Sequence, residues 1–174
     1  MTDERYPIGP APHGSPPTPA ERAVLIAALR ALPGEFRAAL NGLTDAQLNT
    51  PYRDGGWTLR QLAHHVPDSH LNAYIRMKLA LTEDAPVIKP YDEGAWAALP
   101  DSHGDIRVSL ALLDALHARW ATLLDGLTDA QWTRAFVHPD APAPVPLGAA
   151  LATYVWHGRH HTAHVTRWRA RTGA

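Results

Sequence analysis

The chain contains the stretch Gly42-Leu43-Thr44-Asp45-Ala46-Gln47-Leu48 and, 84 residues later, Gly126-Leu127-Thr128-Asp129-Ala130-Gln131-Trp132. In each copy a glycine can end one helix, and a Thr-x-x-Gln capping box can start a short one. The repeat therefore predicts two related helical hairpins, hence an all-α, up-and-down four-helix bundle with approximate twofold character. Chance, or the common use of this capping chemistry, is the alternative explanation.

An irregular arm precedes the first helix, because residues 6–19 hold six prolines. Thr18 is the predicted N-cap, with Pro19 at the first helical position and Glu21 closing a capping box. The helix is expected to run toward Asn41-Gly42 with a kink or break at Pro33-Gly34. The predicted organisation is an arm over 1–17 and a single bundle domain over 18–174.

Three further helices follow from the pattern of apolar residues. One begins after Thr58 and runs to about Leu81, with a kink expected at Pro67. The others cover about 105–125 and 147–171. Residues 83–102 form a long connection, of a length that is uncommon unless it binds something or carries short structure of its own.

Composition limits the function classes. The 174 residues are 45% hydrophobic and 19% charged, with a formal net charge of −1, so neither nucleic acid nor a membrane surface is an indicated partner. No apolar run approaches the roughly 20 residues that span a bilayer, and the first residues lack a signal-peptide core. Zero cysteines exclude disulfides, zinc–thiolate sites and a cysteine nucleophile. We expect a cytoplasmic protein.

Four histidines lie within eight residues of the last helix, in the run Tyr154-Val155-Trp156-His157-Gly158-Arg159-His160-His161-Thr162-Ala163-His164. His157 and His161 are one turn apart on the predicted buried face, whereas His160 and His164 lie at its edge or outside it. Such a pair can hold a metal ion, and bundle metal sites are built from inward side chains. A pair of hydrogen-bonded core histidines is the alternative.

The second helix offers His64, His65 and His70. Periodicity favours His70 and leaves His65 on a flank, but Pro67 makes the phase unreliable, so spacing does not choose a third ligand. Surface or loop positions are expected for the remaining histidines, which are His13, His103, His117 and His138.

Several longer motifs resemble the YfiT family of the DinB superfamily of four-helix-bundle proteins, which also includes bacillithiol transferases. They are Tyr6-Pro7-Ile8-Gly9, Pro51-Tyr52-Arg53-Asp54-Gly55-Gly56-Trp57-Thr58, His64-His65-Val66-Pro67-Asp68-Ser69-His70, residues 74–83, Pro90-Tyr91-Asp92-Glu93 and the histidine run. By position, this resemblance implies metal ligands at His65, His157 and His161. Pro67, where alanine is expected in the family, is one departure; Gly158-Arg159, in place of Ser-His, is another.

The resemblance implies one divalent metal per chain, Zn²⁺ or Ni²⁺, with an open coordination position. YfiT-like proteins carry the label of metal-dependent hydrolases, in which the metal would activate water. In the alternative, the metal would bind the thiolate of a low-molecular-weight thiol such as bacillithiol for transfer to an electrophile. A non-catalytic metal-binding bundle is the third hypothesis.

Candidate substrate contacts lie in loops. Arg53, Tyr91 and Asp92 are positioned to meet a small-molecule substrate, although turn or salt-bridge roles explain them equally well. Asp68, three residues after His65, is a candidate proton acceptor or orienting group, or a solvated helix aspartate. The resemblance also implies a homodimer, to which the arm over 1–17 is able to contribute.

Overall fold

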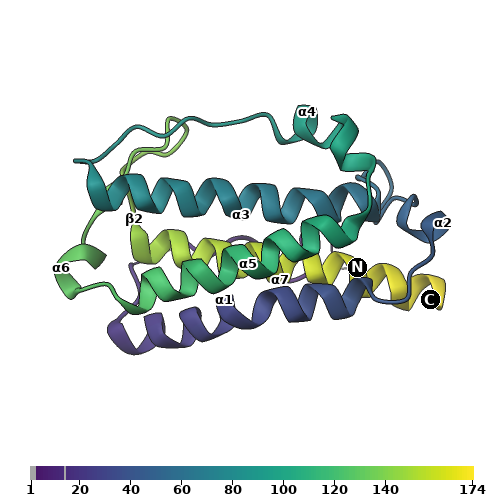
Figure 1. Cartoon of the computed structure of the whole chain (residues 1–174), viewed down its shortest axis with the longest axis horizontal. Coiled ribbons are helices and arrows are strands. Elements are labelled where there is room, and N and C mark those ends of the chain that lie inside the picture. The colour runs from purple at the N-terminus through teal and green to yellow at the C-terminus, as the bar shows by residue number, and fades with distance from the viewer. Residues whose placement is uncertain (1–2, 14) are drawn as a thin grey trace.

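Four long helices make up most of the computed structural model, which describes residues 3–13 and 15–174 (Figure 1). They are α1 (Pro19–Leu40), α3 (Leu59–Thr82), α5 (Ile106–Asp125) and α7 (Leu147–Thr172). The connections contain α2 (Asp45–Leu48), α4 (Glu93–Ala97), the 3-10 helix η1 (Pro100–His103), α6 (Asp129–Trp132) and a hairpin of β1 (Ala135–Phe136) with β2 (Val145–Pro146). The all-α four-helix bundle expected from the sequence is confirmed.

Reciprocal capping boxes begin four of the helices. At α1 the Thr18 hydroxyl accepts from the backbone N–H of Glu21, whose carboxylate accepts from the Thr18 N–H at 2.7 Å. α2, α3 and α6 start in the same way, each from a threonine with a glutamine three residues later. The two copies of the repeated segment therefore each start a short helix, and these lie at opposite ends of the bundle (Figure 1).

Both internal prolines are accommodated without a break. α1 continues through Pro33 and α3 continues through Pro67, so the break allowed for at Pro33-Gly34 does not occur. A proline nitrogen has no hydrogen to give to the carbonyl four residues earlier. In α1 that carbonyl belongs to Leu29, which is fully buried.

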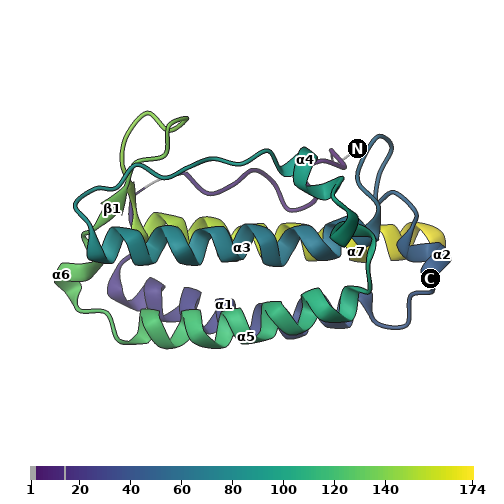
Figure 2. The same ribbon diagram turned by 45° about the horizontal axis from the view of Figure 1, so that its top comes forward.

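The helix directions differ from simple alternation. His64, early in α3, forms a hydrogen bond with Ser109, early in α5. Nearer the C-terminal ends of both helices, Trp120 of α5 donates to the sulfur of Met77 on α3. Early residues pair with early ones and late with late, so α3 and α5 run parallel. The expected alternation holds from α1 to α3 and from α5 to α7, but not from α3 to α5. The reason is visible in Figure 2, where residues 83–105 run back along the bundle before α5 begins. The order is thus up, down, down, up.

The apolar core is divided by a layer of histidines. One buried cluster surrounds Trp120, and a second surrounds Phe36. Along three helices the histidines fall between the residues of the two clusters: His70 on α3, His117 on α5 and the run from residue 157 to 164 on α7. The bundle therefore places a polar layer near its middle.

The N-terminal arm packs along α7 over the part of it that the structure describes. Arg171 bonds Glu4 at 2.7 Å, and Arg167 donates to the Pro7 carbonyl. Further along, Pro17 covers α7 at Gly148. None of the helices in the described residues has the length and apolar character to cross a membrane.

Candidate metal centre

Three imidazoles from α3 and α7 meet at the edge of the histidine layer. His65 lies on α3, and His157 and His161 are one turn apart on α7. Nε2 of His157 is 3.3 Å from Nε2 of His65 and 3.2 Å from Nε2 of His161. One ring nitrogen from each lies within 4.8 Å of the other two, which is close enough for a single metal ion to contact all three.

Burial keeps these imidazoles uncharged. It lowers the pKa of His65 from the ordinary 6.5 to about 4. Burial is also the largest cause that holds the pKa of His157 and of His161 well below 6.5, and repulsion from neighbouring histidines adds to it. Neutral imidazole is the form that binds a metal, so at neutral pH the group has the protonation state that an ion requires.

The group opens into a cavity of ≈ 930 Å³ whose wall includes all three histidines. The Trp57 ring packs against His65 with centroids 4.7 Å apart. Arg76, which is buried, also lines the cavity, and it donates to the Tyr154 hydroxyl at 3.5 Å and to the Lys89 carbonyl at 3.3 Å. Both of these partners are neutral, and the carboxylate of Glu93 lines the same cavity.

The candidate substrate residues divide into two groups. Arg53 lines the cavity, and its guanidinium donates to the Asp54 carbonyl at 2.9 Å. Tyr91 and Asp92 are not among the lining residues. The Tyr91 ring packs on Trp96 with centroids 4.4 Å apart, and burial raises the pKa of Tyr91 to about 12. Asp92 caps α4. The substrate roles of all three stay predictions.

Asp68 lies on α3 outside the residues that line the cavity. It is half-buried, and burial, followed by repulsion from Asp101, raises its pKa to about 6. A carboxyl group with that pKa exchanges protons near neutral pH. However, Asp68 does not line the cavity that the three imidazoles face. Its catalytic role therefore also stays a prediction.

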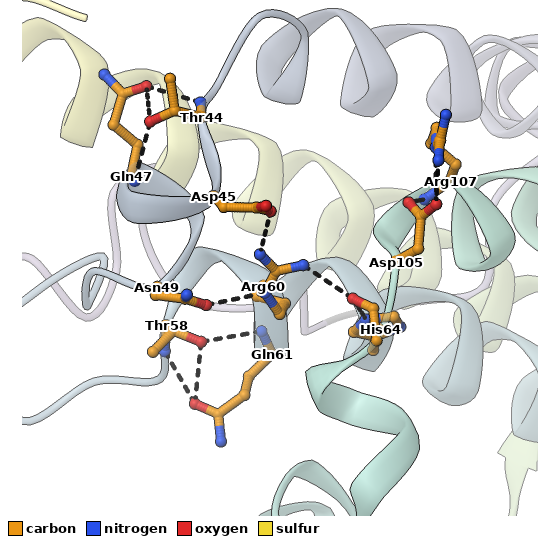
Figure 3. A network of polar contacts seen from close by, with 11 residues as sticks. Thr44, Asp45, Gln47, Asn49, Thr58, Arg60, Gln61, His64, Asp105 and Arg107 are labelled. Carbon is orange, nitrogen blue, oxygen red and sulfur yellow. Dashed lines mark hydrogen bonds and ion pairs between the residues drawn. The ribbon is translucent and has the colours of Figure 1, made fainter.

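His64, the neighbour of His65, belongs to a separate polar network (Figure 3). Its Nδ1 is 2.7 Å from the Ser109 hydroxyl, and its Nε2 is 3.2 Å from the Gly104 carbonyl oxygen. Arg60 donates to the same carbonyl at 2.9 Å. The two adjacent histidines thus have different surroundings. His64 forms hydrogen bonds that join α3 to the start of α5, and His65 faces the cavity.

Two expectations about the other histidines are wrong. His117, expected at the surface or in a loop, is 1% exposed and lies on the inner face of α5. Its position one turn after Leu113 and three residues before Trp120, both buried, was the available sequence signal. His160 and His164, expected at the edge of the buried face or outside it, are also buried.

His160 and His164 are buried by segments outside α7, whose positions helical periodicity does not predict. The Tyr6 ring of the arm approaches His160 with centroids 6.1 Å apart. The Tyr52 ring of the loop before α3 covers His164 at 4.3 Å. Nδ1 of His164 lies 3.3 Å from Nδ1 of His161, and these two with His160 form a second group that could hold an ion.

The chain is similar to known proteins over most of its length. The model of the DinB superfamily matches residues 28–165. A Bacillus cereus protein named "Putative metal-dependent hydrolase" is 51% identical over 171 residues, covering 98% of each chain. A Bacillus subtilis (strain 168) protein, "Putative metal-dependent hydrolase YfiT", is 49% identical over 169 residues, covering 97% of this chain and 95% of its own.

One solved structure is similar over 98% of both chains, with a TM-score of 0.95 and 48% sequence identity. It is described as "YfiT from Bacillus subtilis is a probable metal-dependent hydrolase with an unusual four-helix bundle topology". The parallel α3 and α5 of the present chain are a departure from simple up-and-down bundles.

Proposed function

This chain belongs to the DinB superfamily, and we propose that it is a metal-dependent hydrolase that holds one divalent ion, Zn²⁺ or Ni²⁺, through His65, His157 and His161. The observation that carries the proposal is the convergence of three uncharged imidazoles, two buried and that of His157 half-buried, on one wall of a cavity. The names of the relatives support the class of reaction.

The donor set fits such an ion. The His157 Nε2 atom faces two other Nε2 atoms at 3.2 and 3.3 Å, an arrangement in which an ion at their centre gives every lone pair a partner. Three nitrogen ligands without a carboxylate suit zinc or nickel and leave a position open for substrate or water. Three neutral ligands also leave the full charge of the ion in the site.

The second feature of the site is the charged part of the cavity wall, which contains Arg53, Arg76 and Glu93. A bound divalent ion would supply Lewis acidity, to polarise an acyl oxygen or to lower the pKa of a water molecule. The Arg76 guanidinium, buried in the same wall and bonded to the Tyr154 hydroxyl and the Lys89 carbonyl, is placed to bind an anionic or carbonyl oxygen of the substrate. A cavity of ≈ 930 Å³ suits a small molecule.

Transfer of a low-molecular-weight thiol such as bacillithiol is the second candidate function. Three neutral nitrogen donors would support a thiolate as readily as a water molecule. The chain contains no cysteine, so no thiol of its own competes for the ion. Both functions share the same ligand set and differ in the nucleophile.

The test is a pair of screens on protein stripped of metal and reloaded with zinc or nickel. One panel contains esters, amides and lactones, and the other contains a low-molecular-weight thiol with epoxides and alkyl halides. We expect hydrolysis that needs the metal, that is lost in His157→Ala and that is kept in His64→Ala. Consumption of electrophile only with thiol present would favour the transferase, and a metal-loaded protein inert in both panels would favour a non-catalytic bundle.

A homodimer in the cytoplasm completes the proposal. Light scattering on the purified protein tests the assembly, for which twice the 19.0 kDa chain mass is expected. A monomer at micromolar concentration would remove the dimer and leave the metal site untouched, because all three proposed ligands come from one chain.

A further inference from the structure

Two buried imidazoles connect the proposed metal site to the backbone of α1. The Nδ1 atom of His157 is 3.1 Å from Nε2 of His70. Nδ1 of His70 is 2.8 Å from Nε2 of His117, and Nδ1 of His117 is 2.6 Å from the carbonyl oxygen of Leu29. His70 and His117 are 0% and 1% exposed. All four long helices thus take part in a single line of hydrogen bonds, to which α3, α5 and α7 each contribute one ring.

The line ends at the Leu29 carbonyl, whose regular donor within α1 is missing. In a regular helix the Leu29 oxygen accepts from the backbone N–H of residue 33. Residue 33 is a proline, which has no N–H to give. A buried carbonyl without a donor is costly, and His117 supplies the missing hydrogen bond.

A carbonyl oxygen only accepts, and this fixes the direction of every bond in the line. His117 must carry its proton on Nδ1 to donate to Leu29, so its Nε2 is an acceptor. His70 then donates from Nδ1 and accepts at Nε2. His157 must in turn donate from Nδ1, which leaves its Nε2 without a proton and facing His65 and His161.

We propose that the Leu29 carbonyl, acting through His117 and His70, holds His157 in the Nδ1–H tautomer and so presents an unprotonated Nε2 to the metal. His70 and His117 are positioning residues in this scheme, which rests on the proposed function for the identity of the ligand. Metal-bound histidines commonly donate their second ring nitrogen to a partner that fixes tautomer and orientation. Here the partner of His157 is His70. The tautomer of His70 is fixed by His117, which donates to the carbonyl that Pro33 leaves without its regular donor.

The same geometry argues against a proton relay. A relay needs a group at its far end that gives or receives a proton and exchanges it with solvent. The far end is a backbone carbonyl next to an enclosed imidazole, so a proton that entered the line would have no exit. Fixing a tautomer requires only that the line stay in place.

The first test reads the tautomers directly in metal-free protein labelled with ¹⁵N at histidine. Long-range ¹H–¹⁵N correlation spectra near neutral pH distinguish a proton on Nδ1 from one on Nε2, and single-histidine variants assign the signals. We expect the Nδ1–H tautomer for His157, His70 and His117. An Nε2–H tautomer at His70 or His117 would overturn the proposal, whether or not any variant folds.

The second test measures zinc affinity by competition with a chelator. His117→Leu removes the acceptor of His70 and is expected to weaken binding by roughly tenfold, the lower end of the effect of partners behind a metal ligand. His117→Gln keeps a donor for Leu29 and an acceptor for His70, so it is expected to recover most of the affinity. His64→Leu, which removes a buried histidine outside the line, is the matched control and should bind zinc like wild type.

The two tests separate this inference from the proposed function. Wild type that shows the three Nδ1–H tautomers but binds neither zinc nor nickel would contradict the metal site and leave the line of hydrogen bonds intact. Wild type that binds zinc, with equal affinity in His117→Leu, would keep the metal site and overturn the positioning role.

Discussion

Acidification should destabilise the metal-free protein, because its buried histidines resist protonation. Burial lowers the pKa of both His65 and His117 from 6.5 to about 4 in the folded chain. Below pH 6.5 the unfolded chain therefore binds protons that the folded chain does not, so stability present above pH 6.5 is lost as the pH falls toward 4. Between about pH 7.5 and 5.5 each such histidine costs about 1.4 kcal/mol, and the pair about 3 kcal/mol.

Urea denaturation of chelator-treated protein at the two pH values measures this loss. With a slope of about 1–3 kcal/mol per molar urea, the midpoint should fall by at least about 1 M. His117→Leu removes one titrating group, so its own pH-dependent loss should be smaller by about 1.4 kcal/mol. A midpoint that is the same at both pH values would refute the claim that these imidazoles are held neutral.

Two further substitutions test the packing around the site. Gly158→Ala places a Cβ 2.7 Å from Cδ2 of Leu32, which is too close for both atoms to stay in place. Thermal unfolding should therefore show a loss of about 1–3 kcal/mol of stability. Gly34→Ala is the control, because its added Cβ meets nothing within 4 Å, and it should not lower the melting temperature. Arg60→Met removes three hydrogen bonds from the network of Figure 3. Urea denaturation should show a loss of about 2–4 kcal/mol of stability, and the zinc content should stay unchanged. Loss of zinc from the folded variant would mean that the network supports the metal site.

Local chemistry in the sequence predicted most of the fold. Capping threonines mark the starts of α1, α2, α3 and α6 because their side chains accept from backbone N–H groups that have no carbonyl partner within the helix. The parallel order of α3 and α5 was not predicted, since it depends on where the connection over 83–105 runs. No periodicity within a helix records that path.

The histidine layer was predicted only in part, because patterns within one helix do not record contacts with segments that are distant in the sequence. Helical spacing correctly placed His157 and His161 on an inner face, and the family resemblance, now confirmed by the DinB match, pointed to His65. Spacing failed for His160 and His164, because the segments that bury them lie far away in the sequence. It also gave no hint that His117 completes a hydrogen bond left open by Pro33, since that pairing joins two helices.

Metal content per chain tests the central claim most directly. Protein produced without a histidine tag or nickel column would be analysed by mass spectrometry, with wild type beside His65→Ala, His157→Ala, His161→Ala and His164→Ala. We predict about one zinc or nickel ion per wild-type chain, its loss in the first three variants, and near-wild-type content in His164→Ala. Folded wild type without metal, or full metal retention in His161→Ala, would contradict the proposed site.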